Sequence, residues 1–88
     1  MRTNNMTNEA PRKANLIDEQ IGQRFRLRRT AVGLTQADLA KLLGVTFQQI
    51  QKYERGINRI SASRLYEAAK HLDISISYFF ESGDGDLI

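Results

Sequence analysis

Cysteine and tryptophan are absent from the 88 residues, and the chain has only one histidine and one proline. Without cysteine there can be no disulfide framework, thiolate zinc site or cysteine nucleophile, and a single histidine excludes a multi-histidine metal centre. No nucleophile, base and orienting group occur at supporting spacings, so an enzyme is not expected. We therefore predict no metal and no cofactor.

Long hydrophobic runs are also missing. The chain is 41% hydrophobic and 26% charged, and no apolar run approaches the roughly 20 residues that span a bilayer. The first sixteen residues lack the apolar stretch of a signal peptide, and the lack of cysteine is compatible with a reducing compartment. A chain of this length has room for one small core. We expect a single cytoplasmic domain.

Positive charge is concentrated in the middle of the sequence. The net charge is +3, yet residues 24–64 carry nine Lys and Arg against two acidic residues, whereas residues 65–88 sum to −4. A basic segment followed by an acidic one is typical of a surface that binds a polyanion such as nucleic acid. A solvated, charged helical surface is the alternative that charge alone leaves open.

Hydrophobic spacing, capping residues and glycines predict an all-α fold with five short helices. Residues 1–15 are polar and contain the only proline, so we expect a flexible N-terminal arm. The domain is expected over residues 16–82, with a short tail at 83–88. The predicted helices are residues 17–32, residues 36–43, Thr46 to about Arg55, Ser61 or Ser63 to Leu72, and residues 75–81.

The second and third predicted helices form a unit in which one helix crosses the other and exposes its first turn. Ala40 permits close contact between the helices, and Gly44 permits a positive φ in the turn. Val45, Ile50 and Tyr53 are expected to pack inward. The side chains expected to face outward are Phe47, Gln48, Gln51 and Lys52.

These outward side chains suit the base edges of a DNA major groove. Glutamine can bond adenine N6 and N7, lysine can reach guanine O6 and N7, and an apolar ring can touch a thymine methyl group. We therefore predict base contacts by Phe47, Gln48, Gln51 and Lys52. The three-residue spacing between Phe47 and Ile50 leaves inward packing of the Phe47 ring as an equal alternative.

The stretch TQADLAKLLGVTFQQIQKYERG, residues 35–56, resembles the helix-turn-helix of the Cro/C1 (XRE) family of bacterial and phage repressors. The resemblance covers about residues 17–82 and implies a lambda-repressor-like DNA-binding domain. It implies a sequence-specific regulator of transcription, most often a repressor, whose partner is double-stranded DNA. Regulation would follow from occlusion or recruitment of RNA polymerase.

The resemblance also implies roles for individual residues. Gln36 would contact a DNA phosphate and brace the recognition helix, although Phe47 stands where relatives have a polar residue that can bond this glutamine. Arg29 and Glu54 match an ion pair between the first helix and the recognition helix. Arg24, Arg26 and Arg28 are expected on a solvated face with occasional phosphate contact. The expected phosphate contacts are Gln36, Thr46, Arg55, Asn58, Arg59 and Arg64.

Three consecutive aromatic residues at 78–80 cannot all face one small core, so at least one is expected to be available to a partner. The resemblance implies a homodimer through this C-terminal helix, with Ile76, Phe79 and Phe80 at the interface. Two recognition helices would enter successive major grooves about 34–36 Å apart on a roughly palindromic operator. The alternative function is an antitoxin-like protein-interaction module with secondary DNA binding.

Overall fold

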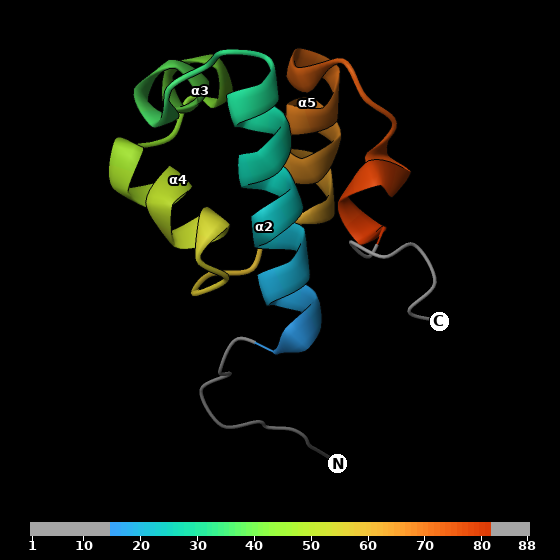
Figure 1. Cartoon of the computed structure of the whole chain (residues 1–88). Coiled ribbons are helices and arrows are strands. Elements are labelled where there is room, and N and C mark those ends of the chain that lie inside the picture. Colours follow the sequence, from blue (N-terminus) through green and yellow to red (C-terminus); the bar gives the residue numbers. More distant parts are fainter. Residues whose placement is uncertain (1–14, 82–88) are drawn as a thin grey trace.

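The computed structural model describes residues 15–81, and this part of the chain is helical (Figure 1). The all-α fold class is confirmed, although the last predicted helix is a short 3-10 helix. The predicted arm and tail lie outside the described residues, except that Asn15 caps the first helix. The elements are α2 (Leu16–Ala31), α3 (Gln36–Leu43), α4 (Phe47–Glu54), α5 (Ala62–Leu72) and the 3-10 helix η1 (Ile76–Phe80).

Each α-helix begins with a polar side chain that accepts a hydrogen bond from a backbone N–H of the first turn. Asn15, Thr35, Thr46 and Ser61 take this role for α2, α3, α4 and α5. Such a cap contributes about 1 kcal/mol because the first N–H groups of a helix have no partner within the helix. The capping pattern therefore sets the start of every α-helix close to its predicted position.

Two glycines are required by the backbone arrangement of the two-helix unit. Gly44 ends α3 with a φ of 71°, a left-handed conformation that turns the chain toward α4. Gly22, in the middle of α2, lies against the end of α4, and a Cβ atom there would stand 2.4 Å from the carbonyl oxygen of Tyr53. Without a side chain at position 22, α2 and α4 approach closely and α4 is held against the body of the domain.

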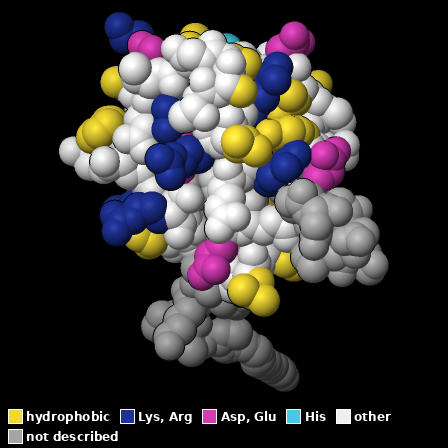
Figure 2. Space-filling view, viewed as in Figure 1, with side chains coloured by type: hydrophobic (Ala, Val, Ile, Leu, Met, Phe, Trp, Pro, Cys, Tyr) yellow, Lys and Arg dark blue, Asp and Glu magenta, His cyan; other side chains and the backbone are white. Residues whose placement is uncertain are grey.

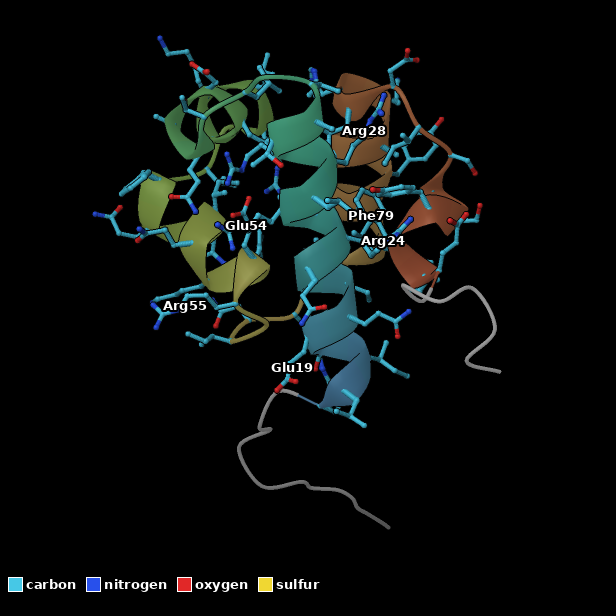
Figure 3. All side chains as sticks on the ribbon, in the orientation of Figure 1. Glu19, Arg24, Arg28, Glu54, Arg55 and Phe79 are labelled. Carbon is cyan, nitrogen blue, oxygen red and sulfur yellow. The ribbon has the colours of Figure 1, made fainter. Side chains whose placement is uncertain are left out.

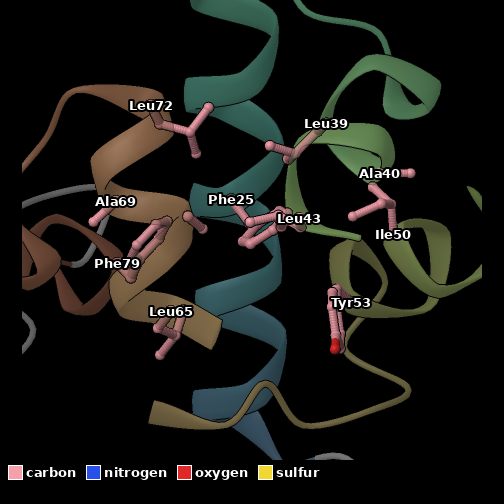
Figure 4. Packing of buried hydrophobic residues seen from close by; sticks show 11 residues of the cluster. Phe25, Leu39, Ala40, Leu43, Ile50, Tyr53, Leu65, Ala69, Leu72 and Phe79 are labelled. Carbon is pink, nitrogen blue, oxygen red and sulfur yellow. The ribbon is translucent and has the colours of Figure 1, made fainter. Parts of the chain in front are cut away.

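The hydrophobic core is centred on Phe25 of α2, whose side chain is fully buried (Figure 4). Its ring stacks on Phe79 at 5.9 Å and meets Tyr53 edge-on at 6.0 Å. Aromatic pairs at this spacing add about 0.5–1.5 kcal/mol to the effect of burial. The core therefore joins α4 on one side of α2 to η1 on the other.

The 3-10 geometry of η1 changes the assignment of one residue that was predicted at a dimer interface. A 3-10 helix has three residues per turn, so three consecutive side chains point in three directions about 120° apart. Phe79 points inward and is 0% exposed, Tyr78 is half-buried, and Phe80 points outward with 52% exposure. The prediction that Phe79 lies at a dimer interface is wrong, because this ring fills the core of its own domain.

Two arginines of α2 fasten the C-terminal part of the domain instead of forming a solvated face. The Arg24 guanidinium lies 3.9 Å above the Tyr78 ring and forms an ion pair of 3.1 Å with Glu81. Arg28 donates from Nε to the Leu72 carbonyl at the end of α5, at 2.9 Å. Figure 3 shows both arginines directed toward this side of α2, away from α4. The prediction of a solvated face is therefore wrong for both.

Candidate nucleic-acid interface

Helix α4 has one buried face and one exposed face. Ile50, Tyr53 and Glu54 are buried against α2 and α3. Gln48 and Lys52 are exposed, and Gln51 is half-buried. Within residues 15–81, the side chains of Gln48 and Lys52 form no hydrogen bond or ion pair with the protein, so their donors and acceptors remain available to a ligand.

The C-terminal end of α4 is held by a buried ion pair. The Arg29 guanidinium of α2 binds the Glu54 carboxylate through Nε to Oε2 and through Nη2 to Oε1 at 3.0 Å. The two side chains are only 9% and 3% exposed. Arg29 Nη1 also donates to the Leu34 carbonyl at 2.8 Å, between α2 and α3. This pair therefore fixes the end of α4 relative to both preceding helices.

Gln36, the first residue of α3, joins the same cluster. Its Nε2 donates to Glu54 Oε1 at 3.0 Å. The expected bracing of the recognition helix by this glutamine is thus made through Glu54, since Phe47 has no hydrogen-bonding atom. Sequence reasoning missed this bond because it joins residues 18 positions apart, and only the helix packing brings them together.

Phe47 stands at the start of α4 with 43% of its surface exposed. It lies outside the buried core and borders a surface groove that is shared with Gln36, Gln51 and Arg55. Arg26 of α2 also lines this groove, which its position in the sequence did not reveal. Of the two alternatives left open for the Phe47 ring, the structure places it at the surface beside the candidate base-contacting residues.

The residues predicted to contact phosphates differ in how free their side chains are. Arg55 is exposed, whereas Asn58 is half-buried. Thr46 uses its hydroxyl oxygen to cap α4. Arg59 donates to Asp18 at 3.0 Å but remains about half exposed. Arg64 donates from Nη1 to the Leu43 carbonyl at 2.7 Å and to Glu67 at 3.1 Å, so its primary contacts are structural.

Figure 2 shows basic side chains on both sides of α2, and Figure 3 shows Arg55 at the lower end of α4. The charges of Arg29 and Glu54 compensate each other inside the domain, and Arg59 is paired with Asp18. The exposed Lys52 and Arg55 therefore determine the sign of the surface along α4 and at its end. At the start of α3, hydrogen bonding by Thr35, chiefly from its backbone N–H, holds the pKa of Asp38 below its usual value. This carboxylate therefore stays ionised at neutral pH.

Within the part of the chain that the structure describes, no group of three or more His, Asp or Glu side chains is arranged to hold a metal ion. No helix between residues 15 and 81 is both long and apolar enough to cross a membrane. Of the residues predicted at a dimer interface, Ile76 and Phe80 are exposed at 37% and 52%.

Comparison with known proteins identifies relatives of this arrangement. The chain is 51% identical over 78 residues to an HTH-type transcriptional regulator of Sinorhizobium medicae, which covers 89% of this chain and 56% of that protein. The restriction-modification controller protein C.AhdI from Aeromonas hydrophila is 37% identical with a TM-score of 0.67, over 70% of this chain and 94% of that one. SinR, a master regulator for biofilm formation solved in complex with DNA, is 27% identical with a TM-score of 0.64, over 69% and 98%.

The chain spans about half to two thirds of the length of the curated relatives it matches, from 49% to 66%. The helix-turn-helix family HTH_3 matches residues 25–79, which include all of α3, α4 and α5 and the buried Arg29–Glu54 pair. The predicted resemblance is therefore confirmed, and the chain belongs to the HTH_3 helix-turn-helix family, of the Cro/C1 (XRE) type.

Proposed function

We propose that this chain is a sequence-specific regulator of transcription, most simply a repressor, that binds double-stranded DNA by inserting α4 into the major groove. The observation that carries the proposal is the division of α4 into a face buried by Ile50 and Tyr53 and a face that exposes Gln48 and Lys52. Family membership and relatives named as transcriptional regulators support the same function.

Base recognition in this proposal belongs to the outward side of α4. Gln48 offers the amide pair that matches adenine, and Lys52, one helical turn further on, offers a donor for guanine. The exposed Phe47 ring suits contact with a thymine methyl group. Gln51, half-buried in the groove beside Phe47, has a smaller share of its amide available.

Phosphate contacts position the protein on the duplex without reading sequence. Arg55 is the strongest candidate because it is exposed and unpaired within residues 15–81, at the end of α4. Gln36 stands at the start of α3, where the N–H groups of the first turn attract anions. Thr46, Asn58 and Arg59 surround α4 and complete the set. Arg64 is a weaker candidate because its guanidinium is already bound by Leu43 and Glu67.

A homodimer is part of the proposal, because one domain makes too few base contacts to select a site in a genome. Ile76 and Phe80 supply exposed apolar surface on η1. Two copies joined there would read a roughly palindromic operator in two successive major grooves, about 34–36 Å apart. The protein would act in the cytoplasm on chromosomal DNA and would block or recruit RNA polymerase.

Selection of bound sequences from random double-stranded DNA tests this function directly. The expected result is a short inverted repeat whose half-site centres are about 10–10.5 base pairs apart. Enrichment of no sequence, with binding of equal strength to every duplex, would contradict sequence-specific recognition. A single half-site without symmetry would contradict the dimer alone.

The antitoxin-like alternative rests on a different surface. Tyr66 of α5 and Phe80 of η1 are exposed aromatic side chains that could bind another protein. Purification of the native complex from its source cells distinguishes the two functions. A stoichiometric partner protein, together with no DNA binding at low salt by the isolated chain, would favour the interaction module.

A further inference from the structure

Three side chains of α2 bind the C-terminal part of the domain through its backbone. Gln20, Arg24 and Arg28 are spaced four residues apart, so they lie on one side of the helix. Gln20 donates from Nε2 to the Phe80 carbonyl at 3.2 Å. Arg24 donates from Nε to the Tyr78 carbonyl at 3.2 Å, and Arg28 donates to the end of α5. The place of η1 on α2 is therefore fixed by donors that do not depend on the side chains of η1.

Arg24 is the central member of this row and holds η1 at both ends of its last turn. Its Cζ atom lies 3.9 Å from the centre of the Tyr78 ring, and its Nη2 donates to Glu81 Oε1 at 3.1 Å. These two partners stand directly before and directly after the two phenylalanines of η1. The Arg24 side chain is only 16% exposed and its guanidinium is a rigid plane, so these contacts restrict the rotation of η1 on α2. The outward direction of Phe80 therefore depends on Arg24.

The other side of α2 holds α4. Gly22 allows the close approach of α4, and Arg29 forms the buried ion pair with Glu54. Figure 1 shows α4 and η1 on opposite sides of α2, which stands between them. One helix therefore carries both the base-reading helix of the proposed function and the exposed Phe80 side chain of the proposed dimer. The distance and angle between these two elements are set by how firmly each is fixed to α2.

We propose that Arg24 is a positioning residue that determines the half-site spacing of the operator. By holding η1 on α2, it fixes how far and at what angle α4 stands from the two-fold axis of a dimer joined through Phe80. This inference rests on the proposed function and on its dimer in particular. One additional base pair between half-sites shifts the second half-site by about 3.4 Å and rotates it by about 35°. A dimer with a firmly held η1 is expected to reject this shift, whereas a dimer with a loosely held η1 should follow it.

Affinities for operators of different spacing test this positioning role. The two duplexes are the selected operator and the same operator with one base pair inserted between its half-sites. Arg24→Met keeps an apolar stem and removes the charge and all donors. The wild-type protein is expected to bind the lengthened duplex at least about tenfold more weakly, because a misaligned second domain loses base contacts. Arg24→Met is expected to reduce this ratio to about threefold or less, because η1 can then adjust.

Each protein is measured at a concentration where sedimentation equilibrium shows a dimer, so that weaker association does not alter the ratio. The matched control is Lys41→Met, which removes the same charge from an exposed side chain of α3 and is expected to keep the wild-type ratio. A wild-type ratio in folded, dimeric Arg24→Met would overturn the inference even if both affinities fell, because Arg24 would then contribute only charge or stability. A wild-type chain that forms no dimer, or that binds both duplexes equally, would contradict the proposed dimer itself, so the two failures are distinguishable.

A second measurement needs no substitution and remains decisive if Arg24→Met does not fold. Nuclear magnetic relaxation of the arginine Nε–H groups reports their order in the free protein. The Arg24 Nε–H group is expected to be nearly as ordered as the backbone of α2, whereas the exposed Arg26 serves as a mobile reference. Equal mobility of the two groups would overturn the inference, because a mobile guanidinium cannot hold η1 in one orientation.

Discussion

Alanine substitution of the adjacent residues Phe79 and Phe80 tests which of the two side chains belongs to the core and which to the surface. The two side chains are chemically identical and consecutive in η1, but Phe79 is 0% exposed and Phe80 is 52% exposed. Phe79 stacks on Phe25 at 5.9 Å. Phe79→Ala therefore removes a ring from the centre of the core, whereas Phe80→Ala removes one that is half in solvent.

The expected free-energy losses differ several-fold. Loss of a fully buried phenylalanine costs about 3–5 kcal/mol, from lost burial and from the cavity that remains. A chain of this size has a total stability of about 4–13 kcal/mol, so Phe79→Ala is expected to leave the domain marginally folded or unfolded at room temperature. Phe80→Ala is expected to change the stability of the monomer by about 0.5 kcal/mol or less.

Urea unfolding followed by far-ultraviolet circular dichroism measures both losses, and a series of protein concentrations separates any contribution of dimer formation. Sedimentation equilibrium of Phe80→Ala then measures its dissociation constant, which is expected to rise if η1 forms the dimer contact. Equal destabilisation of the monomer by the two substitutions would refute the assignment of Phe79 to the core and Phe80 to the surface.

Three further changes follow from contacts within residues 15–81. Glu54→Ala is expected to cost about 3–5 kcal/mol in urea unfolding because it leaves the Arg29 guanidinium buried without its partner, and the loss should shrink when Arg29 is replaced as well. The pKa of Asp38 is lowered in the folded state, so its contribution to stability is present above the unfolded pKa and is lost as the pH falls through the folded value. Asp38→Asn should therefore flatten the dependence of the unfolding free energy on pH below about pH 4, measured by urea unfolding at a series of acid pH values. Gly22→Ala should lower the urea concentration at the midpoint of unfolding by more than an alanine substitution at an exposed position, since its Cβ would lie 2.4 Å from the Tyr53 carbonyl oxygen.

Local signals in the sequence were sufficient to predict the α-helices. Each helix start carries a capping side chain, such as Thr35 or Thr46, and Gly44 ends α3 where a left-handed residue is needed. These features act within four or five residues of the chain. They therefore predicted α3 and α4, and with them the exposed positions of Gln48 and Lys52, without knowledge of the tertiary structure.

The contacts that sequence reasoning missed all join distant segments. Arg24 binds Tyr78 and Glu81, more than 50 positions away, and Gln36 binds Glu54 across the junction of three helices. The inward direction of Phe79 depends on η1 being a 3-10 helix, and an aromatic run carries no clear signal for that geometry. An arginine or glutamine can serve equally at a solvated surface, a helix end or a phosphate, and only packing decides among them.

The central claim is that the outward side of α4 reads DNA bases, and the ratio of affinities for a selected operator and a scrambled duplex tests it most directly. Gln48→Ala is expected to lower the free energy of discrimination between the two duplexes by about 1–3 kcal/mol, with nearly unchanged binding to scrambled DNA. Arg55→Ala, as the matched control, should weaken binding to both duplexes. It should also reduce the slope of log binding constant against log salt concentration by about one unit. An unchanged ratio in Gln48→Ala and in Lys52→Ala would contradict base recognition by α4.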